Sequence, residues 1–304
     1  MDSIAVLLEA PERLSLRSLA LNPLGSADVL VEIDWSGISS GTEKLLWTGR
    51  MPSFPGMGYP LVPGYESVGR VVDAGAEVRA RIGEWVFVPG ANCFADARGL
   101  FGGTARRVIL PAARAIPVPE RLGSDGILVA LAATAHHAVV GGKAPELVVG
   151  HGVLGRLIAR VSVALGHAAP TIWETDPARC DGVAIDPSAD ERRDYATICD
   201  ASGGDVLDAL VPRLAKGGEI ALAGFYDRVT FAFPPAFMRE ARLRISAEFT
   251  PVDLAAVIAL VASGALRLDG LVSHVRPAME ASDAYPAAFA GGDCLKMVLD
   301  WRTM

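Results

Sequence analysis

The chain has 304 residues, of which 51% are hydrophobic and 21% are charged, and this composition excludes a disordered chain. At roughly 150 residues per domain, the length predicts about two domains, whose cores need no disulfide or metal. The formal net charge of −7 argues against a nucleic-acid-binding protein, which would usually carry a basic face.

Cysteine usage and hydropathy indicate the setting in which the protein works. None of the four cysteines forms a Cys-x-x-Cys pair, so neither a zinc knuckle nor a disulfide framework is expected. The first residues, MDSIAVLLEAPERL, contain acids and lack the long apolar core of a signal peptide. Apolar runs such as residues 254–266 are shorter than the roughly 20 residues that cross a bilayer. We therefore expect a cytoplasmic protein with no integral membrane segment.

The first 120 residues are predicted to form an irregular β-rich domain. Short apolar or alternating runs, typical of strands, occur at residues 4–8, 29–35, 67–73, 85–88 and 106–110. Glycine and proline clusters such as FPGMGYPLVPGY (54–65) separate these runs. No helical period is sustained in this part of the chain.

From about residue 124 the pattern changes to alternating helices and strands. A predicted helix (124–140) precedes apolar strands at 147–149, 171–173, 196–199 and 219–223. Strands that alternate with helices favour a doubly wound parallel sheet. From residue 253 a helix, a strand near 271–275, a further helix and a last strand (296–300) follow. We expect this C-terminal segment to return to the first domain.

A glycine cluster follows the strand 147–149 and opens a helix. Its sequence, Gly-His-Gly-Val-Leu-Gly, matches the dinucleotide-binding fingerprint in the strand-loop-helix context that the fingerprint requires. Gly150 permits the tight turn, Gly152 lets the backbone approach a pyrophosphate, and Gly155 allows close helix packing. Val153 and Leu154 complete the predicted cofactor loop at the helix N-terminus. The alternative is a glycine-rich loop that binds no ligand.

An acidic residue ends the strand that follows the fingerprint. Glu174 lies 19 residues after Gly155, close to the spacing of roughly 20 expected for a carboxylate that binds a ribose diol. A carboxylate there repels a 2′-phosphate, so NAD is predicted over NADP. Asp176 is the competing candidate, and Arg179 weakens the argument because an arginine can accommodate that phosphate.

Two residues after later strands are candidates for contact with the nicotinamide half. Ala201 and Gly224 follow predicted strands of the parallel sheet. Ligands of such sheets bind beyond the carboxyl ends of the strands. The alternative for Gly224 is turn geometry alone.

The order of these features resembles the medium-chain dehydrogenase/reductase superfamily over nearly the whole chain. The resemblance is carried by SGISSGTE (36–43), VPGYESVGRVVDAG (62–75), IGEWVFV (82–88), GGTARRVILP (102–111), the fingerprint, KGGEIALAGF (216–225) and ASGAL (262–266). It implies an α/β protein with a GroES-like β-rich catalytic domain over 1–122 and 253–304. It also implies a Rossmann NAD-binding domain over 123–252.

The chain departs from the zinc enzymes of that superfamily at their metal ligands. Ser39 and Ser40 stand in the landmark where those enzymes carry a cysteine, and Tyr65 stands where they carry a histidine. Their second cysteine ligand and their structural-zinc lobe are also missing. Catalytic zinc needs about three N, S or O ligands, and serine and tyrosine are poor substitutes. We expect no metal.

Residues 35–71 are similar to the bacteriochlorophyllide dehydrogenases of bacteriochlorophyll biosynthesis. This resemblance implies oxidation of a 3-(1-hydroxyethyl) group on the macrocycle to 3-acetyl, with NAD as acceptor. Trp47, Phe54 and Tyr59 are flat apolar candidates for contact with the tetrapyrrole, and Arg50 is a candidate partner for its carboxylate. The alternative is that these residues fill the β-domain core.

Without zinc, a side chain must accept the proton of the substrate hydroxyl. Tyr65 is a candidate because it replaces a zinc ligand, although its phenol would need a positive neighbour. His136 and His137 are candidates because imidazole suits proton transfer near neutral pH, unless they are core or cofactor-contacting histidines. Thr42 is a candidate proton relay.

Three functions remain open at this point. The first is the NAD-dependent, zinc-independent bacteriochlorophyllide dehydrogenase, with a tetrapyrrole substrate and a homodimer considered as its assembly. The second is a zinc-independent alcohol dehydrogenase or quinone/enone reductase of the same superfamily. The third is a non-catalytic nucleotide-binding subunit.

Overall fold

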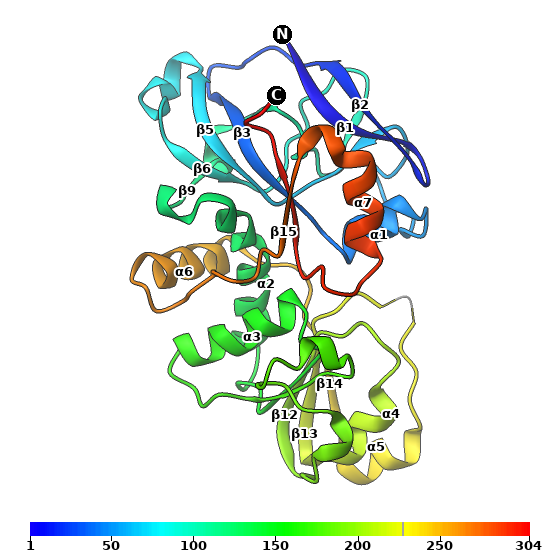
Figure 1. Ribbon diagram of the computed structural model, residues 1–304. Coiled ribbons are helices and arrows are strands. Elements are labelled where there is room, and N and C mark those ends of the chain that lie inside the picture. The colour runs from blue at the N-terminus through cyan, green and yellow to red at the C-terminus, as the bar shows by residue number, and fades with distance from the viewer. Residues whose placement is uncertain (227) are drawn as a thin grey trace. The chain divides into compact units, whose positions relative to one another are not determined.

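The computed structural model describes residues 1–226 and 228–304 as two compact units (Figure 1). The first comprises Met1–Ala130 with Asp269–Met304, and the second comprises Leu131–Leu268. The sequence boundaries at 123 and 253 differ from these mainly by helix α6 (Pro251–Ala262). That helix joins the second unit because its Asp253 binds two histidines of α2 (Val129–Val140).

The first unit is built on two mainly antiparallel sheets. The larger has the order β15-β16-β3-β5-β6-β9, and β8 also pairs with β3. Its strands are His274–Pro277 (β15), Met297–Asp300 (β16), Asp28–Ile38 (β3), Ser67–Ala74 (β5), Trp85–Val88 (β6), Ile116–Pro117 (β9) and Arg107–Pro111 (β8). The smaller sheet, β2-β1-β4-β7, contains Arg13–Ala20 (β2), Asp2–Ala10 (β1), Leu61–Val62 (β4) and Arg98–Gly99 (β7). The sequence analysis missed strand β2, whose leucines alternate with arginine and serine and which is mostly exposed or half-buried.

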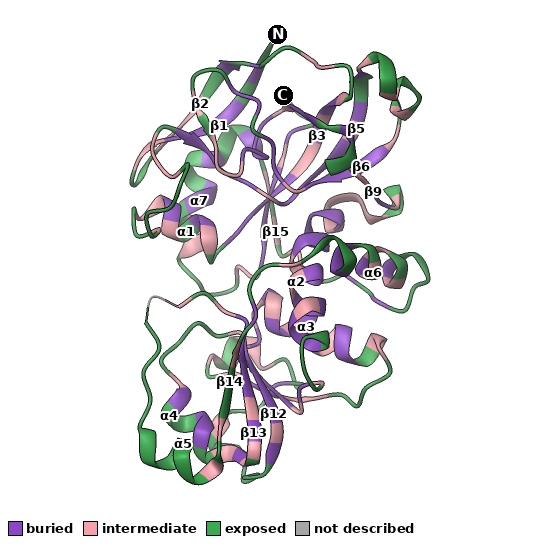
Figure 2. Cartoon of the chain, turned by 180° about the vertical axis from the view of Figure 1, so that it is seen from behind, coloured by how far each residue is buried: buried purple, intermediate pink, exposed green. Residues whose placement is uncertain are grey.

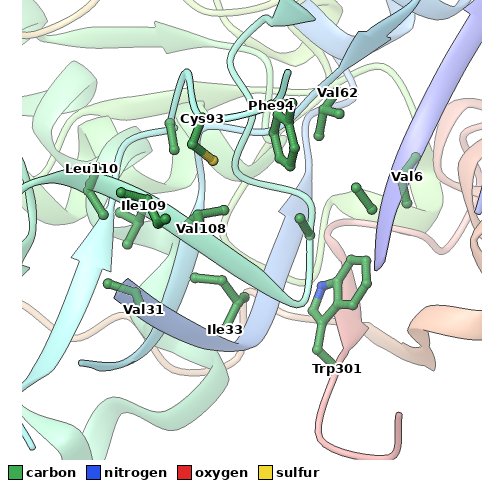
Figure 3. Packing of buried hydrophobic residues seen from close by; sticks show 14 of the residues in the cluster. Val6, Val31, Ile33, Val62, Cys93, Phe94, Val108, Ile109, Leu110 and Trp301 are labelled. Atoms are coloured by element: carbon green, nitrogen blue, oxygen red, sulfur yellow. The ribbon is translucent and has the colours of Figure 1, made fainter. Parts of the chain in front are cut away.

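The predicted C-terminal return is explained by strand β16. It pairs antiparallel with β3, with Met297 opposite Ile38. Trp301, fully buried, donates a hydrogen bond from Nε1 to Ser36 Oγ across 2.9 Å. Figure 3 shows this indole within the same apolar cluster as Val6 and Ile33. The chain end is therefore part of the first unit's core. Two helices complete this unit, Thr42–Trp47 (α1) and Ala281–Phe289 (α7).

The second unit contains the predicted parallel sheet, in the order β11-β10-β12-β13-β14. Its strands are Thr171–Trp173 (β11), Leu147–Val149 (β10), Tyr195–Asp200 (β12), Leu214–Leu222 (β13) and Arg242–Ile245 (β14). All four strand pairs are parallel, and helices Val153–Ala164 (α3), Leu207–Leu210 (α4) and Phe233–Arg239 (α5) connect strands. Figure 2 shows much of β12 and β13 as buried, as expected for central parallel strands. The predicted α/β class is confirmed.

Within residues 1–226 and 228–304, the helices are all too short or too polar to serve as a membrane span.

Candidate active site and dinucleotide loop

The glycine fingerprint forms a tight loop between β10 and α3. Gly150 has φ +90°, a left-handed conformation that favours glycine, and its amide donates to the Trp173 carbonyl across 2.9 Å. A Cβ built on Gly155 would lie only 1.8 Å from the Gly150 carbonyl oxygen, so the helix can approach the loop only with glycine there. Around Gly152, the N-cap of α3, a built Cβ would meet nothing within 4 Å. Val153 and Leu154 form the first turn of that helix. The loop therefore leaves open space at Gly152, beside the start of α3, where the first amides of a helix have no intrahelical acceptor.

Glu174, at the end of β11, binds the fingerprint loop directly. Its Oε2 accepts from the His151 amide across 2.9 Å, and its Oε1 accepts from the amides of Thr175 (2.8 Å) and Asp176 (3.0 Å). Partial burial opposes ionisation, but these three backbone donors and nearby Arg179 outweigh it and hold the pKa below the usual range. Glu174 is therefore a carboxylate at neutral pH.

The competing acid has another role. Asp176 caps the 3-10 turn Pro177–Arg179 by accepting from the Ala178 amide across 3.0 Å. Its other oxygen lies 3.7 Å from Arg179 Nε. Of the two acids, Glu174 is the one that the structure brings to the fingerprint loop.

The two nicotinamide candidates lie just beyond the ends of β12 and β13. The Ala201 amide donates to the Val149 carbonyl across 2.9 Å, which places Ala201 beside the end of β10. The Gly224 amide donates to the Asp200 carbonyl across 3.2 Å, and a Cβ on Gly224 would lie 3.0 Å from the Gly203 amide nitrogen. Close backbone approach thus accounts for glycine at position 224 without a ligand.

In the first unit, Tyr65 stands within a group of hydroxyl side chains. Its hydroxyl lies 2.8 Å from Ser39 Oγ, and its ring contacts Phe101 edge-on with centroids 5.3 Å apart. Burial, reinforced by the charge of Glu66, raises the pKa of the phenol well above its ordinary value. Hydrogen bonds with Ser39 and Thr42 oppose this rise without cancelling it. Tyr65 is therefore a neutral hydrogen-bonding group near pH 7.

Two buried glutamates lie near Tyr65, and their partners come from the C-terminal segment. Glu66 is fully buried and forms an ion pair through Oε2 with Nζ of the buried Lys296. Glu43, also fully buried, accepts from the Tyr285 hydroxyl across 2.8 Å. Burial raises the pKa of Glu43 to about 8, against the opposing effect of the Tyr285 hydrogen bond. Sequence reasoning missed Lys296 and Tyr285, because nothing local to them indicates the pairing.

In the second unit, His136 and His137 share one carboxylate. His136 Nδ1 lies 2.8 Å from Asp253 Oδ1, and His137 Nδ1 lies 2.9 Å from Asp253 Oδ2. Burial opposes ionisation of Asp253, but hydrogen bonds from Thr250 and both histidines hold its pKa far below the usual range. A carboxylate only accepts hydrogen bonds, so both Nδ1 atoms carry protons and both Nε2 atoms can accept them. The His136 side chain is 9% exposed and that of His137 is 32% exposed, so solvent reaches His137 more readily.

The four residues predicted to contact the substrate differ in their contacts and their exposure to solvent. Trp47 packs against Tyr285 and Phe289 with ring centroids 6.3 and 6.4 Å apart, and the Tyr59 hydroxyl donates to the Leu46 carbonyl. Arg50 and Phe54 are exposed. The first pair thus has core contacts, whereas the second is free to meet a ligand.

No group of three or more histidine, cysteine, aspartate or glutamate side chains forms a metal-ligating cluster within the described part of the chain. The expected absence of zinc stays a prediction that rests on Ser39, Ser40 and Tyr65 at the places of ligands.

Comparison with known proteins agrees with this architecture. Residues 25–120 match the alcohol dehydrogenase GroES-like domain family. Two relatives named 2-desacetyl-2-hydroxyethyl bacteriochlorophyllide A dehydrogenase, from Rhodobacter capsulatus and Cereibacter sphaeroides, are 53% and 55% identical over 311 and 315 residues. In both cases the alignment covers 99% of each chain. L-galactonate-5-dehydrogenase of Escherichia coli is 26% identical over 328 residues, covering 94% of this chain and 95% of that one.

Solved structures share the fold at low identity. A short chain alcohol dehydrogenase from Escherichia coli, complexed with NADH, has a TM-score of 0.84 at 21% identity, covering 98% of this chain and 99% of that one. The 2R,3R-butanediol dehydrogenase of Bacillus subtilis has a TM-score of 0.84 at 18% identity with the same coverage.

Fold and comparisons together define a dehydrogenase of the medium-chain dehydrogenase/reductase superfamily, as the sequence predicted. Within it, the chain belongs to the bacteriochlorophyllide a dehydrogenase family.

Proposed function

We propose that the protein oxidises the 3-(1-hydroxyethyl) group of a bacteriochlorophyllide to 3-acetyl, without zinc and with NAD⁺ as acceptor. The observation that carries this proposal is the identity of 53–55% over 99% of the chain to two dehydrogenases named for this class of substrate. In the reaction, the hydrogen of the carbinol C–H bond passes to NAD⁺ with both bonding electrons, as a hydride. The proton of the hydroxyl group passes to a base. The products are the ketone, NADH and a proton.

The second unit supplies the residues that would hold the dinucleotide. The space at Gly152, which a Cβ would enter freely, fits a pyrophosphate facing the amides at the start of α3. Glu174, held ionised, suits a ribose diol and repels a 2′-phosphate, which favours NAD over NADP. Bound NAD⁺ supplies the hydride acceptor.

Each unit, taken by itself, holds candidates for proton handling. Tyr65, neutral near pH 7, would orient the substrate hydroxyl together with Ser39 and Thr42. Within the second unit, His137 is the candidate base, because Asp253 fixes its proton on Nδ1 and its side chain is the more exposed of the pair. Arg50 and Phe54 are the proposed contacts to the macrocycle.

The test is an absorption assay with a hydroxyethyl bacteriochlorin and NAD⁺. Formation of the acetyl group extends conjugation and should shift the long-wave band while NADH appears in equal amount. Glu174→Ala should raise the KM for NAD⁺ strongly and leave the KM for the pigment little changed. Reduction of simple quinones with NADPH would instead favour the quinone reductase alternative. NAD binding without turnover of any alcohol would favour the non-catalytic alternative.

A homodimer is part of this proposal, and the second unit has a surface suited to it. Strand β14 ends the parallel sheet, and α5 beside it exposes Phe233, Phe237 and Met238 around an apolar groove of about 620 Å³. A strand edge with a neighbouring apolar patch is suited to pairing with another chain. Light scattering should give the mass of two chains for wild type and of one chain for Phe237→Glu.

A further inference from the structure

The segment that carries Glu174 is held to the fingerprint loop by three polar side chains. We propose that His151, Arg156 and Asp181, here called the polar clasp, position this segment for the adenosine ribose of the dinucleotide. This inference rests on the proposed function. It extends that function by naming residues that set the affinity for the adenosine half of the dinucleotide.

His151 occupies the second position of the fingerprint and is only 3% exposed. Its Nδ1 lies 2.8 Å from the Arg179 carbonyl oxygen, which can only accept, so Nδ1 carries the proton. Its own amide donates to Glu174 Oε2. One residue of the loop therefore binds both the beginning and the end of the segment 174–179.

Arg156, which directly follows the last glycine of the fingerprint, connects the same elements. Its Nε donates to the His151 carbonyl at 3.0 Å, its Nη2 to the Arg179 carbonyl at 3.3 Å, and its Nη1 to Asp181 Oδ2 at 2.6 Å. The arginine side chain is 17% exposed and that of Asp181 is 38% exposed, so solvent screens the two bonds to backbone carbonyls less than the bond to Asp181. Three bonds from one planar group fix the distance between loop and segment.

Asp181 adds an independent observation, because its backbone is strained. Its φ is +39°, in the left-handed region, which aspartate enters more readily than most residues with a Cβ but still at some cost in energy. Such strain persists only where surrounding contacts compensate for it. The compensating contacts are Arg156 Nη1 and, at 3.6 Å, His151 Nδ1.

The consequence concerns Glu174. Without the clasp, the start of the segment would keep its bonds to the loop, from the His151 amide to Glu174 and from the Gly150 amide to the Trp173 carbonyl, but the Arg179 carbonyl would lose its bonds to His151 and Arg156. The ribose diol would then meet a carboxylate that is still charged but lies on a segment whose end is no longer held to the loop. Affinity for the adenosine half should fall, because binding would have to order the segment.

Calorimetric titration of the full-length protein with ADP-ribose and with NAD⁺ tests the clasp. Arg156→Ala should weaken both ligands about tenfold or more, and Arg156→Lys should recover only part, because lysine cannot make three directed bonds. His151→Asn, which keeps a donor near Nδ1, should bind better than His151→Ala. The matched control is Arg160→Ala, since Arg160 on the same helix bonds the Arg267 carbonyl instead, and its affinities should stay within about twofold of wild type.

Hydrogen exchange in the absence of ligand supplies a second readout. Amides of residues 175–181 should exchange faster in Arg156→Ala than in Arg160→Ala. Wild-type affinity together with wild-type exchange in Arg156→Ala would overturn the clasp while leaving the proposed function intact. Failure of wild type to bind either ligand would overturn the proposed function and the clasp with it.

Discussion

The Tyr285 hydroxyl donates a hydrogen bond to Glu43 Oε2 across 2.8 Å, and both side chains are fully buried. Tyr285 lies on α7 and Glu43 on α1, so the bond joins the C-terminal segment to the element that follows the serine pair. Burial raises the pKa of Glu43 to about 8 even though this bond stabilises the ionised form. The carboxyl group is therefore a titrating part of the first unit's core.

This pKa predicts that stability falls as pH rises. The folded state holds the Glu43 proton up to about pH 8, whereas an unfolded chain releases it near its ordinary value of 4.5. The contribution of Glu43 to the free energy of unfolding is therefore largest below about pH 4.5 and declines as the pH rises to about 8. Urea unfolding of wild type should show this decline. Glu43→Gln should reduce it, because glutamine carries no proton that unfolding could release. Glu66 and Lys296 stay unchanged, so the difference reports on position 43. Parallel pH profiles for the two proteins would contradict the prediction.

The buried pair of Lys296 and Glu66 predicts an asymmetry between single and double variants. Lys296→Met should cost about 3–5 kcal/mol of unfolding free energy, because it leaves an uncompensated charge on the buried Glu66. Lys296→Met combined with Glu66→Gln should restore most of that loss. Urea denaturation of wild type, Lys296→Met, Glu66→Gln and the double variant measures the coupling. Equal stability of the single and double variants would show that the pair is not coupled.

Two glycines of the fingerprint should behave differently when each gains a methyl group. Gly155→Ala should destabilise the protein by about 1–3 kcal/mol, since the new Cβ would overlap the Gly150 carbonyl. Gly152→Ala should leave unfolding within about 0.5 kcal/mol of wild type, because its surroundings are open. It should nevertheless weaken NAD⁺ binding at least about tenfold by entering the space assigned to the pyrophosphate. Thermal unfolding and calorimetry separate these effects, and unimpaired NAD⁺ binding by Gly152→Ala would place the pyrophosphate elsewhere.

Asp253 should be more important for stability than an ordinary surface acid. It accepts hydrogen bonds from two histidines and completes the capping box with Thr250 at the start of α6. Asp253→Ala removes all of these bonds and should cost about 3 kcal/mol. Asp253→Asn retains one oxygen acceptor and should cost less. Denaturant unfolding ranks the two variants, and a cost below about 0.5 kcal/mol for Asp253→Ala would contradict this role.

The sequence by itself determined the features that depend on neighbouring residues. The strand, the six-residue fingerprint and the helix after it are local, and glycine at 150 and 155 is required by backbone geometry within that loop. The α/β class and the superfamily followed from such segments and their order. Boundaries were less accurate, since the strand expected at 271–275 lies at His274–Pro277.

Only the tertiary structure decided which side chains meet across long separations. Asp253 binds His136, more than 100 positions away, and Lys296 pairs with Glu66 because β16 lies beside β3. No local pattern encodes these contacts, since each depends on strand pairing or helix packing that brings remote segments together. Tyr65 shows both sides of this division. Its place at the position of a metal ligand is visible in the sequence, but its protonation state is not. Its neutral state near pH 7 follows from burial and from the charge of Glu66, which only the folded chain reveals.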